Sequence, residues 1–208
     1  MQVETFTAAI LLICLACFFI VNLRNILRAH KRRGNAKVYA EIERPSGIVV
    51  TVAGICTLVY FLEVLSYSLL TSSNPSLLQN SLTFGHHSSY TVILQAAGTL
   101  LTVLGYCLFL WSVIARDRYA TSWSMPENHR LVTWGPYKHV RNPSYLGYFL
   151  MFIGLFALWP SLFTLAPLAA IPGYFQVALK EEELLTKRFG NEYLEYMLKT
   201  GRFLPKLW

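Results

Sequence analysis

The sequence predicts an all-α polytopic membrane protein with five transmembrane helices, the last two forming a helical hairpin, and a helical C-terminal pocket on the cytoplasmic side. Three observations predict this fold. Apolar residues make up 54% of the 208 residues and charged residues only 14%, about half the charge of a typical soluble chain. The apolar residues form long runs. The basic residues gather between these runs, which excludes a nucleic-acid-binding surface despite the net charge of +7.

Four apolar stretches define the predicted spans. Thr5–Val21, Gly47–Leu70 and Tyr90–Ala115 each fit one crossing, because a helix needs about 20 residues to cross the hydrocarbon core. Tyr145–Leu179 has 35 residues, too many for one span and slightly few for two. Pro160 lies near its middle, and proline kinks or ends a helix. The stretch is therefore either one bent helix or a tight helical hairpin.

The distribution of basic residues favours the hairpin. Lys and Arg number seven in residues 22–45, none in 71–89, five in 116–144 and six from Lys180 onward. Basic residues stay on the cytoplasmic side of a membrane. A hairpin puts all 18 on one side, whereas a single bent helix strands the last six outside. We therefore predict an integral membrane protein with the N-terminus outside and the C-terminus in the cytoplasm.

The chain divides into two predicted regions. Residues 1–115 hold three transmembrane helices and a basic cytoplasmic loop, and residues 116–208 hold the polar residues suited to chemistry. A cleaved signal peptide at the N-terminus is disfavoured, because the basic cluster follows the first apolar run and does not precede it.

Cysteines and one buried acid offer little chemistry. All four cysteines lie in apolar spans, and the Cys14–Cys17 pair has no second pair or nearby histidine to complete a metal site. We predict no metal. Glu63 is a carboxylate within a span, either a protonated or hydrogen-bonded residue or a substrate contact.

Residues 129–147 form the first segment with functional potential. Gly135-Pro136 is a turn signal. Asn142 suits the position that caps a helix, and Pro143 suits its first turn. The helix therefore begins at the inner membrane surface, where its free N–H groups favour an anionic group.

Residues 180–196 form the second segment. Three glutamates, Glu181 to Glu183, stand where a helix leaves the membrane, and some of them are expected to be solvated and paired with basic neighbours. Tyr193 and Tyr196 are three apart and can share a helix face. Gly190 can end one helix before another turn begins.

Together the two segments resemble a known family. The pattern HRLV-x-x-GPY-x-x-V-R-x-P-x-Y-L-G covers residues 129–147, EE-x-x-L-x-x-x-FG-x-E-Y-x-x-Y covers 181–196, and Arg202-Phe203-Leu204-Pro205 follows. In order and spacing they resemble the isoprenylcysteine carboxyl methyltransferases, which are related to membrane phospholipid methyltransferases. The resemblance covers Arg116 to Pro205. It implies methyl transfer from S-adenosylmethionine to a lipophilic or lipidated acceptor at the cytoplasmic face.

The resemblance also implies a set of site residues. The cofactor contacts are His129, Leu131, Val132, Gly135, Tyr137, Asn142, Pro143, Tyr145, Leu146, Glu181 and Glu182. Their types fit, because a carboxylate can accept from ribose hydroxyls or an ammonium group and aromatic faces suit a sulfonium. We expect Arg141 and Arg202 to orient the acceptor. The family usually has histidine where this chain has Asn142, and it often has an arginine shortly before the glutamates where this chain has Gln176.

Four functions compete on the sequence alone. Carboxyl methylation of a prenylcysteine-like acceptor needs no base, since a carboxylate is ionised at neutral pH. Methylation of a phospholipid amine needs the acceptor to lose a proton. A membrane sterol-type reductase binding NADPH and a non-catalytic scaffold are further alternatives. We expect the lipid part of an acceptor to enter sideways between helices.

Overall fold

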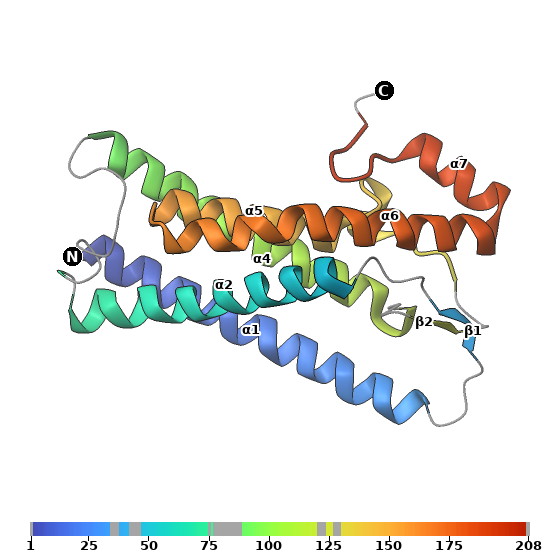
Figure 1. The fold of residues 1–208 in the computed structure, drawn as a ribbon, viewed down its shortest axis with the longest axis horizontal. Coiled ribbons are helices and arrows are strands. Elements are labelled where there is room, and N and C mark those ends of the chain that lie inside the picture. Colours follow the sequence, from blue (N-terminus) through green and yellow to red (C-terminus); the bar gives the residue numbers. More distant parts are fainter. Residues whose placement is uncertain are drawn as a thin grey trace.

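The chain folds into a helical bundle with a shorter helical extension at one end (Figure 1). The computed structural model describes residues 2–33, 38–41, 47–74, 76, 89–119, 124–126 and 130–206. Its long helices are α1 (Gln2–Arg33), α2 (Gly47–Ser73), α4 (Ser89–Arg116), α5 (Pro143–Leu158) and α6 (Ala170–Phe189), and α7 (Asn191–Lys199) is shorter. Three 3-10 turns complete the helical elements: η1 (Asp117–Tyr119), η2 (Gly135–Lys138) and η3 (Phe163–Ala169).

One small feature of the fold was not predicted. Strands β1 (Val38–Glu41) and β2 (Ser124–Pro126) pair antiparallel. Both lie in polar connecting segments, which our sequence analysis treated as loops. Apart from this pair, the part of the chain described by the structure is built from helices, as predicted.

Three described helices are long and apolar enough to cross a membrane: Glu4–Arg28, Gly47–Ser73 and Val92–Arg116. The first extends beyond the predicted Thr5–Val21, because the helix continues through its polar residues to Arg33. Large apolar side chains cover the outside of these helices, such as Ile20, Ile48 and Ile93, each at least 65% exposed. Such an apolar exterior identifies an integral membrane protein.

The fourth apolar stretch breaks at Pro160, as predicted. Helix α5 ends at Leu158, and the next helical turn starts at Phe163. Thr164 secures the break, since its hydroxyl donates to the Trp159 carbonyl at 2.7 Å and its amide donates to Ser161 Oγ at 3.2 Å. These bonds satisfy backbone groups that the interrupted helix leaves free. The chain then runs back along α5 through η3 and α6 (Figure 1).

Helices α4 and α5 approach closely at paired glycines. A Cβ on Gly154 would lie 2.5 Å from the Thr102 nitrogen and 2.8 Å from the Gly98 oxygen. About two turns further along, a Cβ on Gly105 would lie 2.7 Å from the Gly147 oxygen. Small residues let membrane helices bring their backbones together. This contact fixes the start of α5 relative to the end of α4, the two places from which the site is built.

The buried core joins all five long helices. Its buried side chains include those of Leu11, Phe18, Tyr60, Tyr106, Phe109, Met151, Phe152, Leu155 and Ala170. Glu63 lies within this region, 7% exposed, and neither carboxylate oxygen has a hydrogen-bond partner in the described part of the chain. Glu63 is not among the residues that line the cavity of the candidate site.

Candidate active site

The site begins with the loop between α4 and α5. Gly135 adopts φ +62°, and a Cβ there would lie 3.1 Å from that of Ala115, so the turn favours glycine. The indole of Trp134 donates to the Ala115 carbonyl at 3.0 Å and ties the loop to the end of α4. On the other side, the Tyr196 hydroxyl donates to the Tyr137 carbonyl at 2.6 Å. The loop is therefore held between α4 and α7.

The chain after α7 pairs with the start of α5. Arg141 N donates to the Gly201 carbonyl at 2.8 Å, and Asn142 N donates to the Arg202 carbonyl at 3.1 Å. Gly201 N donates to the His139 carbonyl at 3.3 Å. These bonds place residues 200–202 beside residues 139–142, about 60 positions away in the sequence.

Glu182 is the acceptor at the centre of this junction. Its carboxylate is buried, and Oε1 accepts from Asn142 Nδ2 at 2.7 Å and from Arg141 Nε at 3.2 Å. Its Oε2 accepts from Arg202 Nε at 3.1 Å. Hydrogen bonds to a carboxylate are stronger than those between neutral groups. The Asn142 turn and the glutamates of α6 therefore meet, as the sequence predicts.

The role of Asn142 at the helix start differs from the expectation in one respect. Asn142 precedes α5 and Pro143 occupies the first turn, as predicted, but the Asn142 side chain makes no capping bond. It donates to Glu182 instead. The bond from the amide to the buried carboxylate is charge-assisted. It is therefore stronger than the neutral bond that the amide oxygen would accept from a backbone N–H at the helix start.

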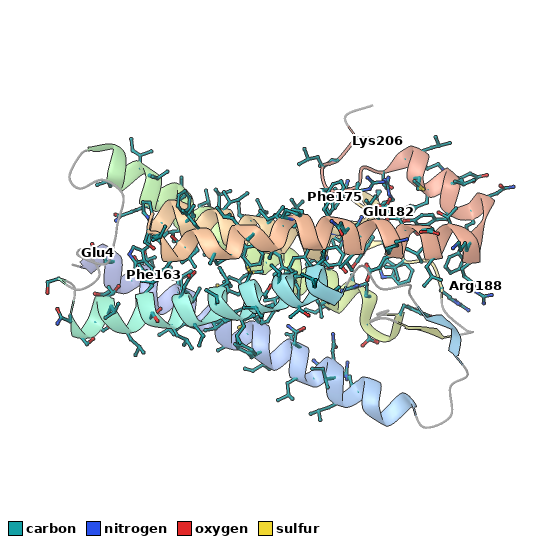
Figure 2. All side chains as sticks on the ribbon, in the orientation of Figure 1. Glu4, Phe163, Phe175, Glu182, Arg188 and Lys206 are labelled. Atoms are coloured by element: carbon teal, nitrogen blue, oxygen red, sulfur yellow. The ribbon has the colours of Figure 1, made fainter. Side chains whose placement is uncertain are left out.

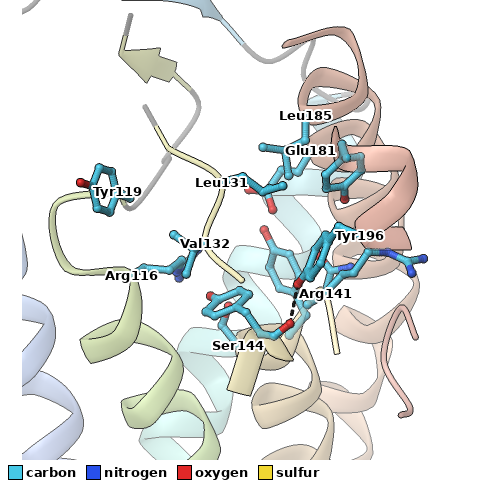
Figure 3. A pocket seen from close by; sticks show the side chains of 13 residues that line it. Arg116, Tyr119, Leu131, Val132, Arg141, Ser144, Glu181, Leu185 and Tyr196 are labelled. Carbon is cyan, nitrogen blue, oxygen red and sulfur yellow. Dashed lines mark hydrogen bonds between the residues drawn. The ribbon is translucent and has the colours of Figure 1, made fainter. Parts of the chain in front are cut away.

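A cavity lies beside this junction, between the end of α4, the start of α5 and the extension formed by α6 and α7 (Figure 3). Its free volume is about 60 Å³, room for a few water molecules, so a larger ligand requires side chains along its edge to move apart. It is lined by Arg116, Tyr119, Leu131, Val132, Tyr137, Arg141, Asn142, Ser144, Tyr145, Glu181, Leu185, Tyr193 and Tyr196.

Three buried polar atoms of this lining have no hydrogen-bond partner in the described residues. They are Arg116 Nε and the hydroxyls of Tyr137 and Tyr193. The Arg116 guanidinium lies 5.9 Å from the centre of the Tyr137 ring, within range of a cation–π contact. Because buried polar groups normally find partners, these atoms indicate that the cavity accommodates a polar ligand.

The neighbouring glutamates have different environments. Burial raises the pKa of Glu181 to about 7, while the Arg116 guanidinium and the Tyr145 hydroxyl oppose that rise. The pKa of Glu183 is instead lowered by hydrogen bonds from Lys187 and Lys180, and its bond to Lys187 measures 2.7 Å. Glu183 is thus the solvated, paired residue that the sequence suggested. Glu181 faces the cavity, and Glu182 holds the junction.

The structure brings many of the predicted site residues together. Those that line the cavity are Leu131, Val132, Tyr137, Arg141, Asn142, Tyr145 and Glu181. Those in the same region that do not line it are Gly135, Pro143, Leu146, Glu182 and Arg202. His129 falls outside the described residues. The functional roles assigned to all of these residues stay predictions.

Sequence reasoning missed several lining residues. Arg116 was counted only as a positive charge at the end of a span, and Ser144 was given no role. Leu185 entered only as part of a motif, and Tyr193 and Tyr196 were placed on one helix face without reference to a site. The sequence held one signal that Arg116 could belong to a site. Arg116 is the first charged residue after a long apolar run, and the side chain of such a residue can face a polar site as readily as solvent.

Comparison with known proteins supports the sequence resemblance. Residues 93–192 match the family model of phospholipid methyltransferases. The match begins inside α4 and ends in α7, before the Arg202–Pro205 motif. The protein-S-isoprenylcysteine O-methyltransferases of Rattus norvegicus and Homo sapiens are each 31% identical over 117 residues, which cover 54% of this chain and 41% of the relative. The resemblance to isoprenylcysteine carboxyl methyltransferases is confirmed.

The similarity to these methyltransferases covers only part of each protein. The chain spans about two-fifths of the length of the curated relatives it matches. A solved structure of a eukaryotic intramembrane Ras methyltransferase, an isoprenylcysteine carboxyl methyltransferase, is 20% identical with a TM-score of 0.49. That match covers 78% of this chain and 54% of the other.

Proposed function

We propose that this protein is a membrane methyltransferase that uses S-adenosylmethionine to methylate the carboxylate of a prenylcysteine-like acceptor. The observation that carries the proposal is the cavity of Figure 3. It combines a carboxylate from Glu181, a cation from Arg116 and several aromatic rings, at one end of a bundle whose exterior is apolar. The relatives' names, and their sequence similarity, support the acceptor class.

The lining residues fit this cofactor. The Glu181 carboxylate accepts from hydroxyl or ammonium groups, the Tyr193 hydroxyl is without a partner in the described residues, and Leu131 and Val132 offer an apolar wall. When bound, the cofactor supplies an electrophilic methyl group on a cationic sulfur. Tyr137 and Tyr145 contribute aromatic faces suited to that cation. Glu182 supports the cavity from outside by holding the start of α5.

Arg116 is the residue we assign to the acceptor carboxylate. The sequence suggested Arg141 and Arg202, but both donate to Glu182, whereas Arg116 lines the cavity with Nε unpartnered. A carboxylate is ionised at neutral pH and needs no base. Catalysis by this chain is then mainly alignment of the acceptor and exclusion of water, and alignment alone can supply on the order of 7–11 kcal/mol.

The membrane arrangement is part of the proposal. Helix α5 has 16 residues, about 24 Å at the α-helical rise. The seven residues of η3 with the apolar start of α6 give roughly 29 Å. With the three long spans this makes five crossings. The basic loops then lie in the cytoplasm together with the C-terminus, and the acceptor's lipid chain enters between helices.

The decisive experiment measures transfer of labelled methyl groups to an S-prenylated N-acetylcysteine by the purified protein in detergent. For Arg116→Ala we expect the acceptor KM to rise about 30-fold or more, since removing one member of a buried charge pair costs at least about 2 kcal/mol. Arg24→Ala is the control, because Arg24 is exposed on α1. No transfer by the unmodified protein, or an unchanged KM for Arg116→Ala, contradicts the proposal.

A second function is favoured by one observation, the match of residues 93–192 to the phospholipid methyltransferase model. An amine acceptor must lose a proton before it can be methylated, so the rate of amine methylation rises with pH. Carboxyl methylation has an ionised acceptor throughout the neutral range. Phosphatidylethanolamine is therefore offered in parallel as acceptor. Transfer to that lipid, increasing with pH, selects the second function.

A further inference from the structure

The segment that follows α7 has an unusual combination of surfaces. We call residues 198–206, the end of α7 and the chain beyond it, the C-terminal hook. Thr200 is 2% exposed, yet Leu198 is 74% and Leu204 73% exposed. Exposed leucines on a polar extension need an apolar partner or an apolar solvent. The position of the hook relative to the membrane helices distinguishes these two cases.

The hook lies against the membrane-spanning helices. The Phe203 ring packs between two aromatic rings, 5.1 Å from Phe149 of α5 and 5.4 Å from Phe175 of α6, centre to centre. Both partners belong to the apolar stretch of residues 145–179. Along the long axis of the bundle, Lys206 lies near the level of Phe175 (Figure 2). The hook therefore sits where the bundle passes from membrane to water.

The apolar surface of the hook continues onto α6. Phe175 is 40% exposed and Leu179 38% exposed. In a membrane protein such side chains on the outside of a span face lipid. Leu198 and Leu204 extend the same kind of surface beyond the end of the span.

A groove with a basic edge runs between α7 and the hook. It measures about 420 Å³ and is mostly apolar, with walls formed by Arg141, Leu194, Met197, Leu198, Gly201, Arg202 and Lys206. Lys206 Nζ donates to the carbonyls of Met197 and Leu198, each at 2.9 Å. No described carboxylate pairs with Lys206. Arg141 and Arg202 share the single carboxylate of Glu182, so this edge keeps an excess of positive charge.

We propose that the C-terminal hook binds an anionic phospholipid of the adjoining leaflet. The lipid phosphate lies against Arg202 and Lys206, and its acyl chains lie over Leu198 and Leu204. A lipid of the surrounding membrane offers both an anion and an apolar chain at this depth. The four residues assigned to the lipid do not line the cavity, although Arg141 contributes to the walls of both, and lipid binding does not depend on methyl transfer.

Photo-cross-linking in nanodiscs tests the proposal. The full chain carries p-benzoylphenylalanine in place of Leu198 or Leu204, in a bilayer of equal parts phosphatidylglycerol and phosphatidylcholine, and mass spectrometry identifies the attached lipid. We expect phosphatidylglycerol to be favoured about fivefold, the preference that one basic residue gives at a membrane surface. The probe at Leu58, 59% exposed on α2, is expected to capture both lipids equally.

Two further measurements assign the preference to the basic edge. Lys206→Gln is expected to reduce the preference for phosphatidylglycerol until the two lipids are captured equally. Lys187→Gln, at the far end of α6, is expected to leave this preference unchanged. In the unmodified chain, raising NaCl to about 0.5 M is expected to weaken it, because salt screens exposed charges. Equal capture of the two lipids in low salt overturns the proposal. So does the absence of lipid adducts, or capture of a second copy of the chain instead of lipid.

Discussion

We expect the carboxyl group of Glu181 to link the stability of the protein to ligand binding, and Glu181→Gln to separate the two effects. Burial raises its pKa to about 7 from the ordinary 4.5. The folded state therefore holds this proton more tightly than the unfolded state. As pH rises from about 4.5 to 7, the unfolded state loses its proton first, and the free energy of unfolding falls by up to about 3 kcal/mol.

Glu181→Gln replaces this carboxyl by a neutral amide, so the fall in the free energy of unfolding with rising pH is removed. Above pH 7, where the penalty is complete, Glu181→Gln is expected to raise the midpoint of thermal unfolding by several degrees. At pH 5 the two proteins are expected to differ by less than about 1 kcal/mol. A substitution that merely damaged packing lowers the midpoint at both values. Thermal unfolding of the ligand-free protein in detergent at pH 5 and pH 8 makes the comparison.

Ligand binding is expected to show the opposite preference. A cationic ligand binds the ionised carboxylate, and the ionised fraction rises about tenfold between pH 6 and pH 8 for a pKa of about 7. Calorimetry with S-adenosylhomocysteine is therefore expected to show about tenfold tighter binding at pH 8 than at pH 6. Glu181→Gln loses this slope, and any slope that remains comes from the ligand or from other groups. An unaltered slope in the variant, or a destabilised variant at pH 8, refutes the assignment.

Three further substitutions test the framework of the site by thermal unfolding. Glu182→Ala leaves its buried basic partners without a carboxylate and is expected to lower the free energy of unfolding by about 3–5 kcal/mol. Glu183→Ala, at an exposed residue, is expected to leave the midpoint nearly unchanged. Equal effects of the two substitutions would contradict the role of Glu182 at the junction. Gly154→Ala forces α4 and α5 apart and is expected to cost about 1–3 kcal/mol, while Gly54→Ala, with nothing within 4 Å of its new Cβ, is tolerated. Tyr196→Phe removes a 2.6 Å hydrogen bond to the loop and is expected to cost about 1 kcal/mol; no loss argues against the loop attachment.

Much of the fold follows from local sequence properties. The long helices appear where the apolar runs predict them, because the thickness of a bilayer sets the length of a span. The break at Pro160 and the start of α5 at Pro143 follow from the missing N–H and fixed φ of proline. The short strands β1 and β2 were missed, since their pairing joins segments more than 80 residues apart and polar loops carry little strand signal.

The division of labour between adjacent glutamates could not be predicted. Successive residues on a helix point about 100° apart, so Glu181 and Glu182 must face different surroundings. The sequence assigned both to the cofactor. The structure places Glu181 in the cavity and gives Glu182 the donors of Asn142, Arg141 and Arg202.

By itself, the sequence determined that the chain lies in a membrane, where its helices start and break, and which two segments form the candidate site. Each of these depends on composition or on neighbours within a few turns. The tertiary structure alone decided that Arg116 shares a cavity with Glu181, and that residues 200–202 pair with the start of α5. Such contacts join residues about 60 positions apart, and they are selected by how whole helices pack and by which buried charges find partners.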